Sequence, residues 1–202
     1  MLENYGIKDG YQTNGYLYFD DRNLTDQYQR SIYQQIADCA RASGVEVILD
    51  VGCGSGYKLV HQLSGEFKTI GMEIEPTLSF LRETYPGNRW ELSDFSRKLD
   101  EPVDMAISVD VIEHVVDPDA LFKFLIGTKA RIIAISTPNR GRCPSEENGP
   151  PGNRCHVREW SLDEFFNYVV DRSVEFGEGH RFDILSHTVH GESQLIVFER
   201  KS

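Results

Sequence analysis

The stretch that decides the fold is Val47-Ile-Leu-Asp-Val-Gly-Cys-Gly-Ser-Gly-Tyr57. Its first five residues are apolar apart from Asp50, a pattern typical of a buried strand. Glycines then occupy alternate positions, at Gly52, Gly54 and Gly56. Because glycine tolerates positive φ and has no Cβ, such a loop lets backbone N–H groups approach a ligand closely. We therefore expect a strand that leads into a ligand-binding loop.

The spacing of the glycines distinguishes between ligands. A dinucleotide-binding turn has the pattern Gly-x-Gly-x-x-Gly, and Tyr57 stands where its third glycine belongs. This difference argues against a pyrophosphate. Gly-x-Gly-x-Gly after an acidic residue, Asp50, instead resembles the first motif of class I S-adenosylmethionine-dependent methyltransferases, whose cofactor carries no phosphate. A glycine-rich turn without a ligand is the alternative.

The chain has 202 residues and a formal net charge of −11. This length suits one α/β domain with a full hydrophobic core, so we expect residues 1–202 to form a single domain. The negative charge would repel a polyanion and argues against nucleic acid as a partner. No apolar run approaches the roughly 18 residues that span a bilayer, and the first residues do not resemble a signal peptide. We expect a cytoplasmic protein without a membrane partner, and the sequence leaves its oligomeric state open.

The four cysteines, Cys39, Cys53, Cys143 and Cys155, form no Cys-x-x-Cys pair. We therefore expect reduced thiols, with Cys53 as a small residue that fills the glycine loop. The nearest approach to a zinc-ligand set is Cys143, Cys155 and His156, in which eleven residues separate the cysteines and the Cys-His pair is adjacent. Zinc sites have a different spacing, so the sequence predicts no metal.

An acidic residue lies near the end of the second predicted strand, Lys68 to Ile74. Glu73 is its last residue but one, beside Ile74. In a doubly wound sheet, a carboxylate at this position accepts hydrogen bonds from both hydroxyls of a ribose. A solvated acid at the end of a strand is the alternative.

A second acidic residue, Asp94, follows the third predicted strand, Arg89 to Leu92. Its carboxylate can accept a hydrogen bond from an adenine amino group, while Phe95 offers a flat apolar face beside the ring. The alternative is a turn aspartate that binds its own backbone.

A longer motif follows the fourth predicted strand, Val103 to Asp110. It reads Asp110-x-x-Glu-His-Val-x-Asp-Pro118. After the glycine loop and the two acids, this motif resembles that of small class I methyltransferases, a family that includes ubiquinone-biosynthesis O-methyltransferases and enzymes that tailor polysaccharides and antibiotics. The resemblance implies that Asp110 lines the wall near the methyl group. It also implies that Glu113 and His114 lie where the chain enters the following turn.

The resemblance and the order of predicted strands and helices imply an α/β, Rossmann-like three-layer sandwich. Its sheet is expected to be seven-stranded and mostly parallel, with a C-terminal antiparallel hairpin over Phe182 to His187 and Gln194 to Glu199. Acids at strand ends suit a cofactor that carries a sulfonium and an ammonium group, and would repel the pyrophosphate of NAD. The expected cofactor-binding residues are Asp50, Gly52, Cys53, Gly54, Gly56, Glu73, Ile74, Asp94, Phe95 and Asp110.

Two long segments lie outside this framework. Residues 1–22 are too aromatic for a disordered tail and predict an arm that folds back onto the domain or over the site. Residues 139–160 predict a long loop on the substrate side. A hydroxyl nucleophile must lose a proton, and histidine suits that task at neutral pH, so His156 in the loop and His114 are the candidate bases. A mechanism without a base stays open.

Together these features predict an S-adenosylmethionine-dependent methyltransferase that produces S-adenosylhomocysteine. Four arginines, Arg140, Arg142, Arg154 and Arg158, favour a small anionic metabolite as the substrate, methylated at oxygen. Pairing of these arginines with loop glutamates is the alternative. A non-catalytic module that binds the cofactor and an NAD-dependent enzyme are the competing functions.

Overall fold

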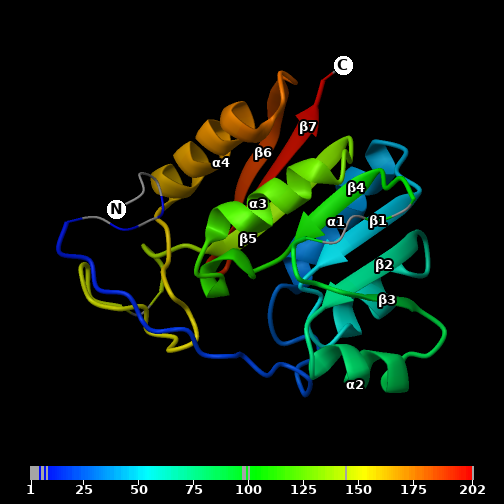
Figure 1. Ribbon diagram of the computed structural model, residues 1–202, viewed down its shortest axis with the longest axis horizontal. Coiled ribbons are helices and arrows are strands. Elements are labelled where there is room, and N and C mark those ends of the chain that lie inside the picture. The colour runs from blue at the N-terminus through cyan, green and yellow to red at the C-terminus, as the bar shows by residue number, and fades with distance from the viewer. Residues whose placement is uncertain are drawn as a thin grey trace.

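The computed structural model contains one seven-stranded sheet with the strand order β3-β2-β1-β4-β5-β7-β6 (Figure 1). It describes residues 5, 7, 9–96, 99, 101–143 and 145–201. The elements in chain order are α1 (Arg30–Ala42), β1 (Val47–Val51), η1 (Leu59–Leu63), β2 (Lys68–Glu73), α2 (Thr77–Thr84), β3 (Arg89–Leu92), β4 (Met105–Ser108), η2 (Ile112–His114), α3 (Pro118–Gly127), β5 (Ile132–Pro138), α4 (Leu162–Phe176), β6 (Phe182–His190) and β7 (Ser193–Arg200).

The pairing of the strands confirms the predicted sheet. Strands β1 to β5 run parallel to one another. The antiparallel strand β7 lies between β5 and β6, and a tight turn at Gly191 joins β6 to β7. The chain moves outward from β1 to β2 and β3, then returns to place β4 on the other side of β1. In open α/β sheets, ligands bind beyond the carboxyl ends of the strands at such a reversal.

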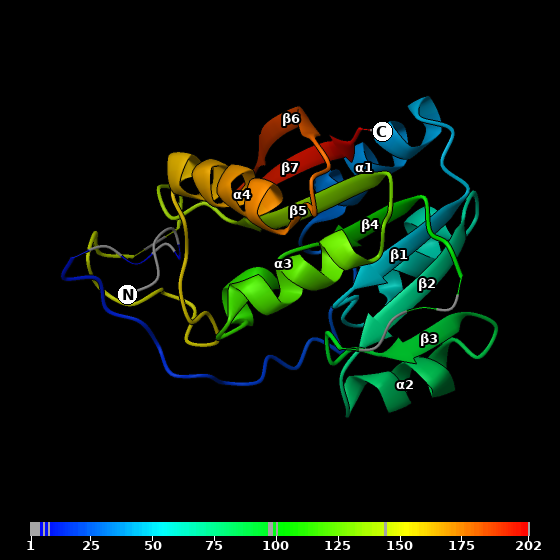
Figure 2. The ribbon, with the colours of Figure 1, turned by 45° about the horizontal axis from the view of Figure 1, so that its top comes forward.

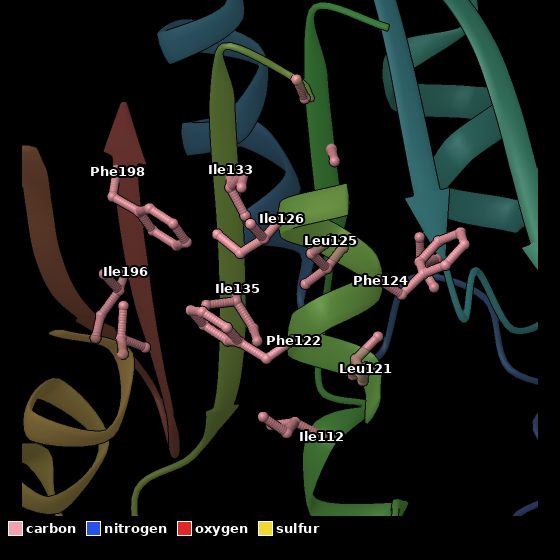
Figure 3. Close-up of a cluster of buried hydrophobic side chains, with 14 of the residues drawn as sticks. Ile112, Leu121, Phe122, Phe124, Leu125, Ile126, Ile133, Ile135, Ile196 and Phe198 are labelled. Carbon is pink, nitrogen blue, oxygen red and sulfur yellow. The ribbon is translucent and has the colours of Figure 1, made fainter. Parts of the chain in front are cut away.

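Alternating side chains of the buried strands form two apolar cores, one on each face of the sheet. Ile133 and Ile135 of β5 pack with the helices α3 and α4, and Figure 3 shows Phe122 of α3 lying against this face. Ile132 and Ala134, one position out of phase, pack with α1, η1 and α2. The period of two along a strand therefore produces the three layers, with α3 and α4 in front of the sheet and α1 behind it in Figure 1.

Helix α1 begins later than its sequence suggests. Thr25 and Asp26 predict a cap, but the helix begins at Arg30 after Gln29, whose φ is 64°. The backbone N–H and the hydroxyl of Thr25 both donate to Gln27 Oε1. This local turn competes with helix formation, as short polar side chains commonly do. Tyr28 consequently lies outside the helix and is 65% exposed.

The N-terminal arm runs beside the long loop that follows β5 (Figures 1 and 2). Gln12 N donates to Asn148 O at 3.0 Å. The Asn14 side chain donates to three loop carbonyls, those of Pro151, Asn153 and His156. Residues 1–4, 6 and 8 of the predicted arm and Pro144 of the predicted loop lie outside the described residues. None of the described helices is long and apolar enough to cross a membrane.

Candidate active site

A cavity of about 1190 Å³ lies at the carboxyl ends of the strands. Its walls come from the arm, the glycine loop, the segments after β2, β3 and β4, the long loop and the turn between β6 and β7. Among the residues that the sequence predicts for the site, those that line it are Gly52, Cys53, Gly54, Glu73, Ile74, Phe95, Asp110, His114 and His156. The sheet reversal has therefore brought most of the predicted site together.

The glycines of the loop are required by positive φ and by neighbouring protein atoms. Their φ angles are 77° at Gly52, 55° at Gly54 and 71° at Gly56. A Cβ at Gly54 would overlap the carboxylate of Asp21, a residue of the arm, which also accepts a hydrogen bond from Ser55 N at 3.1 Å. The predicted reason for Gly54, space for the ligand, is thus incomplete, because the arm occupies part of that space.

Gly56 does not belong to the cavity wall in the part of the chain that is described. A Cβ there would lie 2.5 Å from Leu81 Cδ2 and 2.9 Å from Trp90. This geometry supports a packing role for Gly56, because α2 and β3 approach the loop at this point, and contact of Gly56 with the cofactor stays a prediction. Gly52 lines the cavity and packs against Val111.

Glu73 has the surroundings of a ligand-binding carboxylate. Its Oε2 accepts from Gly54 N at 2.9 Å, and its Oε1 accepts from Ile74 N at 2.8 Å. Burial raises the pKa of Glu73 to about 7, although the two backbone hydrogen bonds act in the opposite direction. A carboxylate has about four acceptor positions. Both oxygens can therefore still accept from ribose hydroxyls.

Asp50 lies in β1, directly before the glycine loop in the sequence. It is fully buried and is not among the described residues that line the cavity. Its Oδ2 accepts from the Tyr33 hydroxyl at 2.8 Å, and its Oδ1 has no hydrogen-bond partner among the described residues. Burial raises the pKa of Asp50 to about 7. The structure thus shows a contact of Asp50 with α1, and a direct contact of this carboxylate with the cofactor stays a prediction.

The Asp94 side chain forms hydrogen bonds within its own turn. Its side chain is exposed, and Oδ1 accepts from both Ser96 N and Ser96 Oγ at 2.9 Å. The described lining of the cavity includes Ser93 and Phe95 on either side of it. Oδ1 thus makes the local contact that the turn interpretation expects, and the contact of Asp94 with an adenine amino group stays a prediction. Phe95 is held at φ 57° and packs against Phe124 with a 6.2 Å separation of ring centroids.

Asp110 forms the wall of the cavity beyond β4. Its Oδ1 accepts from Ser136 Oγ at 2.6 Å, and its Oδ2 accepts from Ser193 Oγ and Gln29 Nε2. Residues from β5, β7 and the start of α1 thus hold one carboxylate. Its φ of 53° turns the chain away from the strand and into η2. Asp110 thus lines the cavity, and its place near the methyl group, which the family resemblance implies, stays a prediction.

The two candidate bases lie next to each other. The rings of His114 and His156 have centroids 4.8 Å apart at an angle of 80°. His114 Nδ1 contacts Cys155 O at 2.9 Å, and burial lowers the pKa of His114 to about 4, with a further contribution from His156. His114 is therefore neutral at physiological pH. Its Nδ1–H donates to the carbonyl, which leaves the lone pair on Nε2.

His156 is held by a buried carboxylate. Its Nδ1 lies 2.8 Å from Glu159 Oε1, and Asn153 Nδ2 donates to its Nε2 at 3.0 Å. Glu159 is 1% exposed and His156 is 8% exposed. A carboxylate at Nδ1 fixes the tautomer with the lone pair on Nε2 and stabilises an imidazolium after proton transfer. Glu159 is not among the residues that the sequence predicts for the site. Its position three residues after His156 is the one signal in the sequence.

A possible metal-binding set also occurs here, made of Glu113, His114 and His156. Their ligand atoms lie within 4.8 Å of one another. Glu113 is fully buried, its Oε2 accepts from Thr137 Oγ1, and its Oε1 has no partner in the described part of the chain. One carboxylate and two imidazoles form a donor set that suits a divalent transition metal. The sequence prediction considered only Cys143 and Cys155 with His156, and so missed this combination.

Two of the four loop arginines are buried and donate to several carbonyl groups. Arg158 is 2% exposed and donates to the carbonyls of Val115 and Val116. Arg140 is 8% exposed and donates to the Glu146 and Gly149 carbonyls. Most of their donors hold the surrounding chain, although the Nε of each has no hydrogen-bond partner among the described residues. This geometry favours the structural alternative for these two side chains over capture of an anionic substrate.

The comparison with protein families decides the assignment. The model of a family described as a methyltransferase domain matches residues 21–169. The chain belongs to this methyltransferase family. With the fold and the glycine loop, this membership makes the protein a class I S-adenosylmethionine-dependent methyltransferase. No curated protein matches the methyltransferase in sequence.

Solved structures share its fold. The methyltransferase domain of bacterial CtHen1-C is 20% identical, with a TM-score of 0.69 over 86% of this chain and 99% of that chain. Magnesium protoporphyrin IX methyltransferase from Synechocystis PCC 6803 with bound S-adenosylhomocysteine is 14% identical, with a TM-score of 0.62 over 93% and 90%. The small RNA methyltransferase HEN1 is 20% identical, with a TM-score of 0.63 over 93% of this chain and 27% of that chain. At these identities the likeness concerns the fold, and bound S-adenosylhomocysteine is consistent with the cofactor of the methyltransferase.

Proposed function

We propose that this methyltransferase transfers the methyl group of S-adenosylmethionine to a hydroxyl oxygen of a small molecule. The observation that carries the proposal is the pair of His156 and Glu159, which faces the same cavity as the glycine loop and Glu73. Cofactor and acceptor groups would then meet in one cavity. The non-catalytic alternative has no use for a histidine oriented in this way by a buried carboxylate.

Methyl transfer is a direct displacement at carbon, so the protein must align the acceptor oxygen behind the sulfonium methyl and exclude water. In the proposed mechanism, His156 Nε2 takes the proton of the acceptor hydroxyl. In this structure Asn153 donates to His156 Nε2, and the acceptor hydroxyl can replace Asn153 as that donor. Glu159 meanwhile keeps Nδ1 protonated. His114 is unsuited to the same task, because its pKa of about 4 makes it a weak base.

The set of Glu113, His114 and His156 fits a divalent cation, and the unpartnered Glu113 Oε1 supports that fit. Such an ion, when bound, would lower the pKa of an acceptor hydroxyl. His114 can offer Nε2 to it, since Nδ1 donates to the Cys155 carbonyl. His156 would then be a ligand rather than a base, and a test must separate these two roles.

The proposed acceptor is a small hydroxylated molecule rather than a nucleic acid. The net charge of −11 opposes a polyanion. A structural neighbour is a small RNA methyltransferase, and RNA is therefore an outcome to include in the test. An anionic group on the acceptor would rely on Arg142 and Arg154, the two loop arginines that remain exposed.

The test is transfer of a labelled methyl group from S-adenosylmethionine to a metabolite extract and, separately, to short RNA oligonucleotides. Each reaction is run with a chelator and with added Mn²⁺. We expect label in a small-molecule fraction and a rate that is lower by about 100-fold or more in His156→Gln, since a positioned base contributes about 10² to 10⁴. S-adenosylhomocysteine affinity should not change in that variant.

Three results would alter the proposal. Label found only in RNA would contradict the acceptor class. A wild-type rate that is abolished by the chelator and restored by Mn²⁺ would make His156 a metal ligand. Normal transfer by His156→Gln would exclude both roles for this side chain.

A further inference from the structure

Lys58 is a buried cation with almost no partner. It follows the glycine loop directly and is 8% exposed. Among the residues that the structure describes, its hydrogen-bond partner is Thr25 O, at a long distance of 3.4 Å from Nζ, and its Nζ lies 5.9 Å from the centroid of the Tyr33 ring. Within the described residues it forms no salt bridge. Burying an ammonium group without an ion pair is costly. An anionic ligand group that binds Lys58 would offset this cost.

The charges of the cavity wall make Lys58 unusual. The described lining contains six acidic residues, namely Asp21, Glu73, Asp110, Glu113, Glu159 and Glu192, and only two residues of the lysine and arginine type, Arg30 and Lys58. Arg30 pairs with Asp26 at 3.2 Å, and its side chain is 65% exposed. Lys58 is therefore the cation of this wall that is both buried and free of an ion pair.

S-adenosylmethionine carries three charged groups at its methionine end. The sulfonium and the ammonium are cations, which an acidic wall accommodates. The carboxylate is an anion, and six acids would repel it unless a cation lies close by. Glu73, the expected ribose acceptor, lies at the end of β2 and accepts from Gly54 N, whereas the Lys58 ammonium lies over the ring of Tyr33 in α1. A ligand that extends across the loop would place its two ends at these two residues.

We propose that the Lys58 ammonium binds the carboxylate of the methionine moiety and thereby selects the complete cofactor over analogues without that carboxylate. This assignment rests on the proposed cofactor site. It makes Lys58 a binding residue that positions the sulfonium, with no part in the chemical step. The alternative role is neutralisation of the nearby Asp50 and Asp21, which would require no contact with the ligand.

The test pairs a change in the protein with a change in the ligand. Calorimetry compares S-adenosylhomocysteine with its decarboxylated analogue, which keeps the adenosine, the sulfur and the amine. We expect the wild-type protein to bind S-adenosylhomocysteine about 10- to 100-fold more tightly, the range of a charge-assisted hydrogen bond. In Lys58→Met, the two ligands should bind with nearly equal affinity. Lys58→Arg should keep a preference of several-fold.

Glu73→Ala is the matched control, since both ligands have the same ribose and should be weakened by the same factor. A wild-type protein that binds the two ligands equally would overturn the proposal, as would an undiminished preference in Lys58→Met. If Lys58→Met fails to fold, Lys58→Gln and the wild-type ratio decide in the same way. Absence of binding by both ligands would instead contradict the cofactor site itself.

Discussion

Glu73 lies at the end of β2 with one carboxylate oxygen on each of two backbone N–H groups, those of Gly54 and Ile74. These bonds aim the side chain at the cavity. We predict that Glu73→Ala weakens the binding of S-adenosylhomocysteine by about 1.5–3 kcal/mol, the loss of charge-assisted hydrogen bonds to the ribose. Calorimetry measures this difference. An unchanged affinity would mean that Glu73 is only a strand-end acid.

Gly54 is restricted by its φ of 55° and by the carboxylate of Asp21. We predict that Gly54→Ala lowers the free energy of unfolding by more than the about 1–2 kcal/mol that a left-handed backbone costs an alanine. The same substitution in an Asp21→Ala background should cost less, because the overlap is then removed and only the backbone strain remains. Equal costs in the two backgrounds, measured by urea unfolding, would show that Asp21 does not restrict this position.

At the scale of single residues, sequence patterns predicted which residues lie near the cavity better than they predicted what each residue does there. The glycine spacing and the acids after strands identified Glu73 and Asp110, because strand ends converge at one edge of a parallel sheet. The same rule did not separate Asp50, which lies in β1 before the loop, from residues that line the cavity. Glu113 and Lys58 acquire their surroundings from contacts with Thr137 and Tyr33, which no local pattern shows.

At the scale of elements, the arm and the long loop stabilise each other and support the proposed base. Tyr11 is 9% exposed, and its hydroxyl accepts from Arg140 and from Glu159 N at 3.1 Å. The Arg140 guanidinium also stacks on the Tyr11 ring, with 4.2 Å between its central carbon and the ring centroid. The arm thus reaches the residue that orients His156.

We predict that Tyr11→Phe lowers the free energy of unfolding by about 1–3 kcal/mol, because a buried N–H loses its acceptor. Methyl transfer should fall more than S-adenosylhomocysteine affinity, since Glu159 holds His156 and does not contact the ribose site. Tyr16→Phe is the stability control, because Tyr16 is 57% exposed and its loss should change stability by no more than about 0.5 kcal/mol. Equal unfolding curves for wild type and Tyr11→Phe would contradict the described packing of the arm.

The regular elements could be predicted because their signals are periodic. Buried strands such as β1 and β5 read as apolar runs, and α4 begins at Ser161 with a capping box to Glu164. The start of α1 could not be predicted, since a turn at Thr25 and the left-handed Gln29 override a plausible cap. The path of the arm depends on tertiary contacts with residues more than a hundred positions away.

At the scale of the whole molecule, burial keeps acids in and beside the cavity partly protonated. The pKa values of Asp50 and Glu73 are raised to about 7 in the folded protein, above their ordinary values. The folded state therefore binds more protons than the unfolded state between about pH 4 and 7. The stability that these groups contribute is fully present below about pH 4 and is lost as the pH rises through about 7.

We accordingly predict that, without ligand, the wild-type protein loses stability between pH 5 and pH 8 relative to Asp50→Asn, which cannot titrate at this position. Urea unfolding of both proteins across this range gives the difference. A constant difference at all pH values would show that Asp50 has an ordinary pKa in the folded protein.

The central claim is that the carboxyl edge of this sheet binds S-adenosylmethionine and its product. The most direct measurement is calorimetric titration of the wild-type protein with S-adenosylhomocysteine, with NADH as the comparison ligand. The site predicts saturable binding of one S-adenosylhomocysteine per chain, weakened in Glu73→Ala, and no binding of NADH, whose pyrophosphate the acidic wall repels. Absence of heat with S-adenosylhomocysteine, or tight binding of NADH at the same site, would contradict it.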